Sequence, residues 1–241
     1  MAPENTLMER SVQNRGILVA ESQVEKLDAK DDLVHFPVRD SLPYRFFKRL
    51  LDITFSLTGI LLFLPLMIPL AILIRLESPG SFIFRQIRVG KNRRHFVCYK
   101  FRSMVPDAEE RKEGLRENNE ASGAMFKIQN DPRITQLGSF LRRSSLDELP
   151  QLFNVLKGDM SIVGPRPQIP SEVEQYEPWH YRRLEVQPGI TCLWQISGRS
   201  SIGFNEWMRL DSDYVQHRGF FYDMKIILLT LPAIIARKGA Y

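Results

Sequence analysis

The sequence has few of the residues that build disulfide frameworks or metal sites. Its two cysteines, Cys98 and Cys192, are too few for a disulfide framework and do not form a CxxC motif. Four histidines are present, and none lies in an HExxH arrangement. These absences exclude a disulfide-stapled scaffold and a histidine-rich metal centre, and a reducing compartment is the simpler expectation.

The sequence also lacks an apolar run near its start. Residues 1–43 mix charged and small residues without a sustained period, which is typical of neither a signal peptide nor a packed core. We therefore expect a mobile N-terminal tail over 1–43. The remainder, 44–241, is long enough to bury a sizeable core and is expected to form one domain.

Acidic residues are in the minority. Lys and Arg number 33 against 28 Asp and Glu, a formal net charge of +5, which suits an anionic membrane surface, a nucleotide or a nucleic acid. The sequence has no zinc-finger spacing and no RNP-type aromatic pattern, and its long apolar segment fits poorly with nucleic-acid binding. We therefore predict no nucleic-acid partner.

One long stretch, 53–74, carries no charged residue. It is long enough to cross a bilayer, which takes ~20 apolar residues. Pro65 lies near its middle and Pro69 one turn later, and each removes an intrahelical hydrogen bond. A bend is expected there.

Basic residues flank both ends of this stretch. Arg45, Lys48 and Arg49 precede it, and Arg75 with further Lys and Arg residues up to position 94 follows it. Under the positive-inside rule both ends belong on the cytoplasmic side. The stretch 53–74 is therefore predicted to be a re-entrant membrane hairpin helix, which dips into one leaflet and returns. A kinked spanning helix and a buried core helix are the alternatives.

Two β-like runs follow at 81–89 and 95–101, separated by a turn at 90–92. They predict a β-hairpin. The second run leads into the motif YKFRSM, in which Lys100 and Arg102 are candidates for gripping a phosphate. Solvated or snorkelling side chains would give the same pattern.

The most distinctive stretch is 142–167, RRSSLDELPQLFNVLKGDMSIVGPRP. Pro150 near the start and Gly158 at the end mark the limits of a predicted helix. Helical spacing gives this helix an apolar stripe of Leu149, Leu152, Phe153 and Leu156.

Asp147 and Glu148 fall at the start of this predicted helix. Unpaired N–H groups and the helix dipole favour carboxylates or phosphates at such a place. Ser145 and Glu148 have the spacing of a capping box, so the alternative interpretation is that the acid pair only caps the helix.

Helical spacing recurs elsewhere, and 134–141 is predicted to be a helix. In 204–214 aromatic residues alternate with charged ones, which is typical of a membrane-surface helix, with a core helix as the alternative. The apolar stretch 220–235 contains charges and a proline and is predicted to be interfacial or buried. The expected fold is mainly α with a small β-hairpin (α+β), in which a re-entrant helix and interfacial amphipathic helices accompany a cytoplasmic catalytic core.

Several motifs occur together in this chain: YKFRSM, then RSSLDELPQLFNVLKGDMSIVGPRP, then PGIT with Trp194 and SGR, all behind one Pro-containing apolar helix. In this combination the chain resembles the bacterial sugar transferases, monotopic polyprenyl-phosphate phosphoglycosyl transferases, over roughly residues 44–236. It departs from the family pattern in two places. Leu64 replaces the Ser of a Ser-Pro pair, and Gln187 and Cys192 replace the Arg and the second Gly of RPGITG.

The resemblance implies an enzyme that transfers sugar-1-phosphate from a UDP-sugar to undecaprenyl (polyprenyl) phosphate and releases UMP. This would be the first membrane step of surface polysaccharide or exopolysaccharide biosynthesis. The resemblance also implies Mg²⁺ as cofactor and a ping-pong mechanism through a phosphosugar-aspartyl intermediate. The implied location is the bacterial inner membrane, with the catalytic domain facing the cytoplasm, and a homo-oligomer is compatible with these features.

The resemblance further assigns roles to single residues. Asp147 is the expected nucleophile, and Glu148 is the expected metal ligand. The predicted contacts to substrate phosphate are Lys100, Arg102, Arg166 and Arg199. A non-enzymatic membrane-surface scaffold, in which the acid pair only caps a helix, is the competing hypothesis and would need no magnesium.

Overall fold

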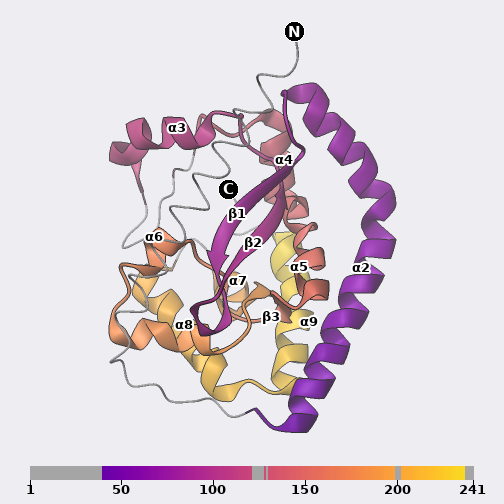
Figure 1. The fold of residues 1–241 in the computed structure, drawn as a ribbon, viewed down its shortest axis with the longest axis vertical. Coiled ribbons are helices and arrows are strands. Elements are labelled where there is room, and N and C mark those ends of the chain that lie inside the picture. Colours follow the sequence, from indigo (N-terminus) through magenta and orange to yellow (C-terminus); the bar gives the residue numbers. More distant parts are fainter. Residues whose placement is uncertain (1–39, 121–127, 129, 199–201, 237–241) are drawn as a thin grey trace.

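The computed structural model describes residues 40–120, 128, 130–198 and 202–236, so that nearly all of the predicted tail lies outside it. The described residues form a mainly helical fold with two small pairs of strands (Figure 1). This confirms the prediction of a mainly helical chain with a small β-hairpin. The helices and strands in chain order are α2 (Leu42–Glu77), β1 (Ile83–Val89), β2 (His95–Phe101), α3 (Ala108–Lys112), α4 (Gln136–Ser144), α5 (Gln151–Lys157), β3 (Ser161–Val163), α6 (Pro170–Val173), β4 (Gly189–Thr191), α7 (Leu193–Ser197), α8 (Phe204–His217) and α9 (Phe220–Ala236).

Strands β1 and β2 form the predicted antiparallel hairpin, with Val89 opposite His95 and Ile83 opposite Phe101. The turn between them contains Asn92, whose φ of 53° lies in the left-handed region that Asn tolerates. Helix α4 agrees with the helix predicted over 134–141, and the hydroxyl of Thr135 caps its start by accepting from the N–H of Gly138. Local patterns therefore determined both elements.

Strands β3 and β4 form a parallel pair that the sequence patterns did not predict. The pair requires two glycines, because a Cβ on Gly164 would lie 2.2 Å from the carbonyl oxygen of Gln187, and one on Gly189 would lie 2.1 Å from the N of Gly164. This close approach places the GPRP and PGIT segments side by side.

Helix α5 buries most of the predicted apolar stripe and two polar side chains in addition. Gln151 and Asn154 are buried together with Leu152 and Val155, whereas Phe153 is 42% exposed. Leu149, Leu152 and Leu156 of the predicted stripe pack in or against the core, so only the prediction for Phe153 is wrong. Asn154 adds a polar contact to the buried side of α5 through its bonds to β2.

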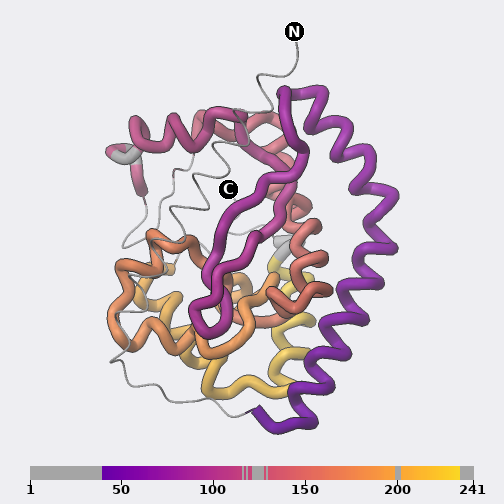
Figure 2. Tube along the Cα trace, viewed as in Figure 1, coloured from indigo at the N-terminus to yellow at the C-terminus, as the bar shows by residue number. Residues whose placement is uncertain are grey.

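Helix α2 runs unbroken through Pro65 and Pro69. Figures 1 and 2 show one helix along one side of the molecule that curves outward and changes direction between its two ends, so the predicted bend is confirmed as a smooth curve, whereas the predicted re-entrant membrane topology stays a prediction. Buried side chains on both sides of the prolines, among them Ile60 and Ile74, hold its inner face on the body. The curvature is therefore spread along the helix.

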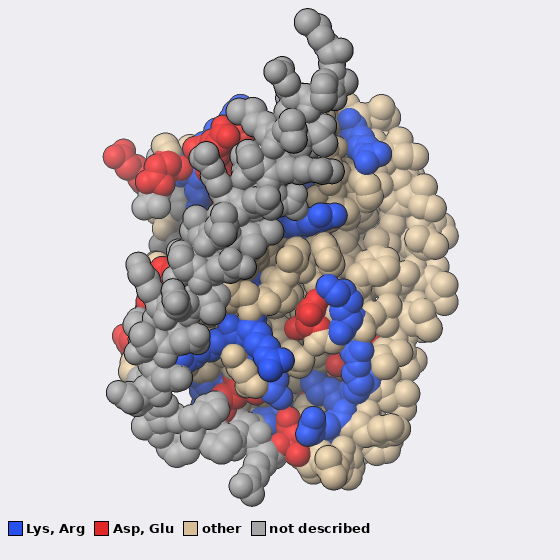
Figure 3. All heavy atoms as spheres, viewed as in Figure 1, with Lys and Arg blue, Asp and Glu red and all other residues tan. Residues whose placement is uncertain are grey.

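The outer face of α2 is apolar and exposed. Among the described residues α2 is the one helix whose length and composition would allow it to cross a membrane, and only 17% of its most apolar window is buried. Figure 3 shows the side of the molecule along α2 as an almost uninterrupted surface without charged groups. The buried core-helix alternative is therefore wrong.

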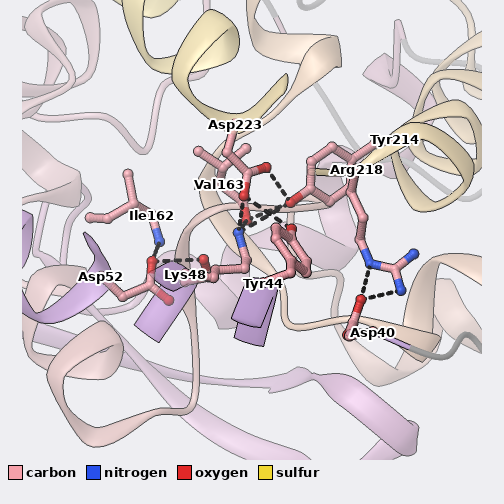
Figure 4. Close-up of polar contacts among 10 residues, drawn as sticks. Asp40, Tyr44, Lys48, Asp52, Ile162, Val163, Tyr214, Arg218 and Asp223 are labelled. Carbon is pink, nitrogen blue, oxygen red and sulfur yellow. Dashed lines mark hydrogen bonds and ion pairs between the residues drawn. The ribbon is translucent and has the colours of Figure 1, made fainter. Parts of the chain in front are cut away.

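The first third of α2 is bound to the body through polar groups (Figure 4). The Nζ of Lys48 donates to the carboxylate of Asp223 on α9 at 2.8 Å. One carboxylate oxygen of Asp52 accepts from the hydroxyl of Ser161 and the N–H of Ile162, both at 2.8 Å. Lys48 is thus an internal anchor in addition to any role as a flanking cation.

The C-terminal end of α2 is bound to the same body. The guanidinium of Arg102 donates to the carbonyl oxygens of Ser78 at 2.6 Å and Pro79 at 2.7 Å, and Glu77 Oε1 accepts from the N–H of Leu137 on α4 at 2.9 Å. Both ends of α2 are therefore fixed to one folded unit.

Helix α8 turns its large side chains inward. Phe204, Trp207, Met208 and Tyr214 are all buried. The core-helix alternative is confirmed, and the membrane-surface interpretation of this segment is wrong. Helix α9 has a buried side and an exposed side, because Ile226 is buried whereas Phe221 is 86% exposed. This agrees with the prediction of an interfacial or buried helix.

Candidate active site

A cavity of about 440 Å³ lies between the β1/β2 hairpin, α4, the turn before α5 and the segment that follows β3. Its walls combine one acid pair with several cations. The lining residues include Lys100, Arg102, Arg142, Asp147, Glu148, Arg166 and Trp194.

Asp147 and Glu148 lie on a short 3-10 turn, Leu146–Glu148, just before α5. Ser145 has a φ of 59°, and this left-handed residue ends α4 and directs the chain into the turn. The predicted capping box is wrong, because the side chain of Ser145 makes no capping bond and the carboxylate of Glu148 accepts from cations instead.

Glu148 is held by two cations. The Nζ of Lys100 and the Nη2 of Arg166 each donate to Glu148 Oε1 at 2.8 Å, and the Glu148 side chain is only 11% exposed. Burial by itself would raise the pKa of Glu148, but the neighbouring Arg166 and Lys100 outweigh it and hold this pKa well below its usual range. Glu148 is therefore ionised at neutral pH.

Asp147 has the opposite environment. It is 8% exposed, and within the described part of the chain its carboxylate accepts no hydrogen bond. Burial raises the pKa of Asp147, the charge of Glu148 raises it further, and Lys100, Arg142 and Arg166 oppose both effects. A carboxylate that faces a cavity without bound donors has its oxygens available for reaction.

Lys100 reaches the acid pair because Asn154 fixes the strand that carries it. Asn154 is fully buried on α5, where its amide donates to the carbonyl oxygen of Val97 at 2.7 Å and accepts from the N–H of Tyr99 at 3.0 Å. The Asn154 amide thus pairs with the backbone at the edge of β2 as a neighbouring strand would. Sequence reasoning missed Asn154, because helical spacing places it away from the apolar stripe, on the side expected to face solvent.

Arg166 is positioned from two directions. The N–H of Gly189 donates to the carbonyl oxygen of Pro165 at 2.9 Å, which fixes the GPRP segment against β4. The Nη2 of Arg183 donates to the carbonyl oxygen of Arg166 at 2.5 Å, and Arg183 is in turn paired with Asp211 at 2.7 Å.

The Arg183–Asp211 pair is almost inaccessible, with side chains 2% and 1% exposed. A buried pair of this kind is costly to break, because either partner alone would be an uncompensated charge. The role of Arg183 could not be predicted from the sequence. Nothing in the charged segment around it indicates that its guanidinium binds the backbone of Arg166.

Arg142 is a further cation in the cavity wall that sequence reasoning missed. Its Nε donates to the hydroxyl of Ser103 at 2.9 Å. The contact depends on Gly138, since a Cβ there would lie 2.0 Å from the carbonyl oxygen of Ser103. Burial lowers the pKa of Arg142, and the charge of Asp147 opposes this effect.

Two other residues, Arg102 and Arg199, were predicted to contact substrate phosphate. Arg102 borders the cavity, and its guanidinium is bound to carbonyl oxygens at the end of α2, where it acts as a cap; its contact to phosphate stays a prediction. Arg199 lies outside the described residues.

The acid pair fits a magnesium ion that takes most of its ligands from a substrate. The described residues contain no cluster of three potential metal ligands. Asp147 and Glu148 nevertheless supply two hard carboxylates in one cavity, and of the Glu148 oxygens only Oε1 accepts the two cations. Mg²⁺ commonly binds one or two protein carboxylates together with substrate phosphates and water.

The arrangement as a whole suits phosphoryl chemistry. Lys100, Arg142 and Arg166 line the same cavity as the two carboxylates. Cations at close quarters neutralise a diphosphate, which would otherwise repel an attacking carboxylate.

Comparison with known proteins finds relatives among sugar transferases. Residues 43–237 match the family model described as Bacterial sugar transferase. The chain is 50% identical over 194 residues to the galactosyl transferase CpsE of Streptococcus agalactiae serotype III, covering 80% of this chain and 43% of that protein. It is 43% identical over 201 residues to the undecaprenyl-phosphate galactose phosphotransferase of Salmonella typhimurium, covering 82% of this chain and 42% of that protein.

A shorter relative matches over most of its length. The exopolysaccharide production protein ExoY of Rhizobium meliloti is 40% identical over 198 residues, which cover 80% of this chain and 88% of that protein. The chain thus spans less than half the length of the first two relatives and nearly all of the third.

Proposed function

This chain belongs to the bacterial sugar transferase family, and on that premise we propose that it transfers a sugar-1-phosphate from a UDP-sugar to undecaprenyl phosphate. The products are UMP and a polyprenyl-diphosphate sugar. Relatives named for undecaprenyl phosphate, for a UDP-sugar and for exopolysaccharide production support this reaction and a place in surface polysaccharide synthesis.

The observation that carries the proposal is the contrast between two adjacent carboxylates. Glu148 is bound by Lys100 and Arg166, whereas Asp147 faces the same cavity without a hydrogen bond from the described residues. Two carboxylates in different environments are suited to different tasks. We assign nucleophilic attack to Asp147 and the binding of cations to Glu148.

In the first step a carboxylate oxygen of Asp147 attacks the phosphorus that bears the sugar. A bond forms between this oxygen and the phosphorus, and the bond from the phosphorus to the bridging oxygen of the diphosphate breaks. The bridging oxygen leaves as part of UMP with the electron pair of the broken bond. The sugar phosphate is then an acyl phosphate of Asp147, and nearby Lys100 and Arg142 offset the charge that the leaving phosphate gains.

In the second step a phosphate oxygen of the polyprenyl phosphate attacks the same phosphorus. The bond to Asp147 breaks, its carboxylate is regenerated, and a new diphosphate links the lipid to the sugar. Arg166 can bind either phosphate because its side chain is 27% exposed at the cavity while its backbone is fixed by Arg183.

Magnesium is proposed as the cofactor, and Glu148 would hold it together with the diphosphate of the substrate. When bound it would polarise the diphosphate and screen its charge from the attacking carboxylate.

The geometry of α2 supports a monotopic attachment to the membrane. Both ends of the helix are bonded to one folded body, through Lys48 and Asp52 at one end and Glu77 at the other. A spanning helix would place these ends on opposite faces of the bilayer, which the common body prevents. We therefore propose that the apolar face of α2 enters one leaflet of the inner membrane from the cytoplasmic side, as an embedded curved helix. A nucleotide sugar from water and a lipid phosphate at the headgroup level can then reach the same cavity.

The test is the release of UMP by the purified full chain from a panel of UDP-sugars, with and without undecaprenyl phosphate and Mg²⁺. We expect up to one equivalent of UMP per enzyme without acceptor, and continuous release when acceptor is added. A ternary mechanism would give no UMP before acceptor is present. A membrane-surface scaffold would release none under any condition.

A further inference from the structure

A second cavity lies at the N-terminal end of α2, away from the acid pair. Its volume is about 650 Å³, and it shares no lining residue with the first cavity. It is bounded by the start of α2, by the corner between α8 and α9, and by Arg182 on the 3-10 segment Pro178–Glu185. We propose that this cavity binds the phosphodiester of an anionic membrane phospholipid.

Arg182 is the first reason. Its Nε is buried and has no hydrogen-bond partner, and no ion pair to its guanidinium is found within the described part of the chain. An unsatisfied buried donor is costly, and it costs more when the group is charged. Arg182 lines the cavity, so an anion there would pair with its charge.

The charge balance of the cavity is the second reason. Arg218 also lines it, and this guanidinium is paired with Asp40, as Figure 4 shows. The two arginines and one aspartate leave a single positive charge, carried by Arg182. A phosphodiester with one negative charge matches this balance, whereas the two charges of a phosphomonoester would exceed it.

The apolar border of the cavity is the third reason. Phe47 and Phe220 line it, with ring centroids 6.3 Å apart, and each also contacts a neighbouring exposed ring, Phe46 at 5.6 Å or Phe221 at 5.5 Å. Exposed aromatic rings gather at the membrane interface. A phospholipid whose phosphate binds Arg182 could therefore place its acyl chains along these rings. This step rests on the proposed membrane attachment of α2.

The experiment is a titration of the detergent-purified full chain with phosphatidylglycerol, followed by native mass spectrometry. Three proteins are compared: the wild type, Arg182→Gln, and Arg209→Gln as a control that removes the same charge from an exposed position on α8. We expect Arg182→Gln to weaken the tightest lipid-binding event about tenfold and Arg209→Gln to leave it within about twofold. Equal binding by all three proteins would overturn the proposal.

A second arm separates a lipid from a free phosphate. Glycerol 3-phosphate and inorganic phosphate carry phosphate oxygens without acyl chains, and we expect neither to displace the bound lipid at millimolar concentration. Complete displacement would assign the cavity to a soluble phosphate and contradict the lipid.

Release of UMP by Arg182→Gln is measured in detergent and is expected to equal that of the wild type. This checks that the variant is folded. It also separates the lipid-binding proposal from the proposed transferase reaction. If the chain binds lipid through Arg182 but releases no UMP, the proposed reaction fails and the lipid site stands. If the chain releases UMP but does not retain lipid, the lipid site fails and the proposed reaction stands.

Discussion

Asp147 and Glu148 are adjacent in the chain, yet their surroundings move the pKa values of the two carboxyl groups in opposite directions. Lys100 and Arg166 both donate to Glu148, and they leave Asp147 as the carboxylate without a bound donor among the described residues. The turn Leu146–Glu148 is responsible, because in it the two neighbouring side chains meet different parts of the cavity wall.

Replacing Asp147 by Asn is expected to abolish both UMP release and covalent labelling. The amide keeps the size of the side chain but loses the nucleophilic oxygen, so we expect turnover to fall on the order of a thousandfold or more. The measurement is the transfer of label from a UDP-sugar with radioactive β-phosphate to denatured protein. Asp159→Asn, outside the cavity, is the control and should label like the wild type. Labelled protein in Asp147→Asn would place the nucleophile elsewhere.

The acid limb of the pH profile should depend on Arg142. Burial raises the pKa of Asp147, and a nucleophile must be ionised, so activity should fall as the pH decreases through a value above that of an ordinary aspartate. The charge of Arg142 opposes the rise, so Arg142→Gln should move the acid limb of kcat/KM to higher pH. A limb that stays in place or moves to lower pH would contradict this arrangement.

The contact between Arg166 and Glu148 should matter for catalysis. Arg166→Gln removes one of two donors from a buried carboxylate, and we expect kcat/KM for the donor to fall on the order of a hundredfold. Lys157→Gln is the control, because Lys157 is 55% exposed and its pair with Asp159 lies on the surface. Similar small effects in both variants would show that Arg166 does not act in the site.

The sequence predicted the elements that depend on neighbours along the chain. The hairpin from Ile83 to Phe101 and helix α4 follow from local alternation, turn residues and helical spacing. The acid pair and the GPRP arginine were proposed as site residues because they stand in a long motif, and their roles stay predictions. The structure brings Lys100, Asp147, Glu148 and Arg166 into one cavity.

Contacts between distant segments were not predictable in the same way. Asn154 bonds to β2 across more than fifty residues, and Arg183 supports Arg166 through a backbone oxygen. Strands of three residues, such as β3, are too short for a period to be recognised. The aromatic residues of α8 fitted a membrane surface or a core equally well, and only the packing partners decided.

Gly138 should be intolerant of any side chain. A Cβ there would lie 2.0 Å from the backbone of Ser103, so Gly138→Ala must push α4, and with it Arg142, away from the segment that follows β2. We expect a loss of about 2–4 kcal/mol in the free energy of unfolding. Urea unfolding in detergent measures it. Gly114→Ala is the matched control, since nothing lies within 4 Å of its Cβ, and it should be neutral within ~0.5 kcal/mol. Equal midpoints for both variants would contradict the close approach.

The membrane position of α2 can be tested with three single cysteines. Leu42 and Leu76 near its ends are each 77% exposed, and Leu62 near its middle is 69% exposed, so all three should react alike in the absence of a membrane. The native Cys98 and Cys192 are buried and give a low background. In inverted membrane vesicles, whose cytoplasmic face is outside, we expect a water-soluble maleimide to label both end positions and to spare Leu62→Cys.

Labelling at position 62 should appear once the membrane is dissolved by a detergent that is then diluted below its micelle concentration. A spanning helix would instead leave one end position unlabelled in sealed vesicles, and a helix lying free of the bilayer would be labelled at all three. The first outcome would require the bonds of Lys48 and Glu77 to the same body to be broken in the membrane. Because Lys48 makes a partly buried ion pair with Asp223, that rearrangement would be costly, and a membrane-embedded helix with both ends on one face is the result we expect.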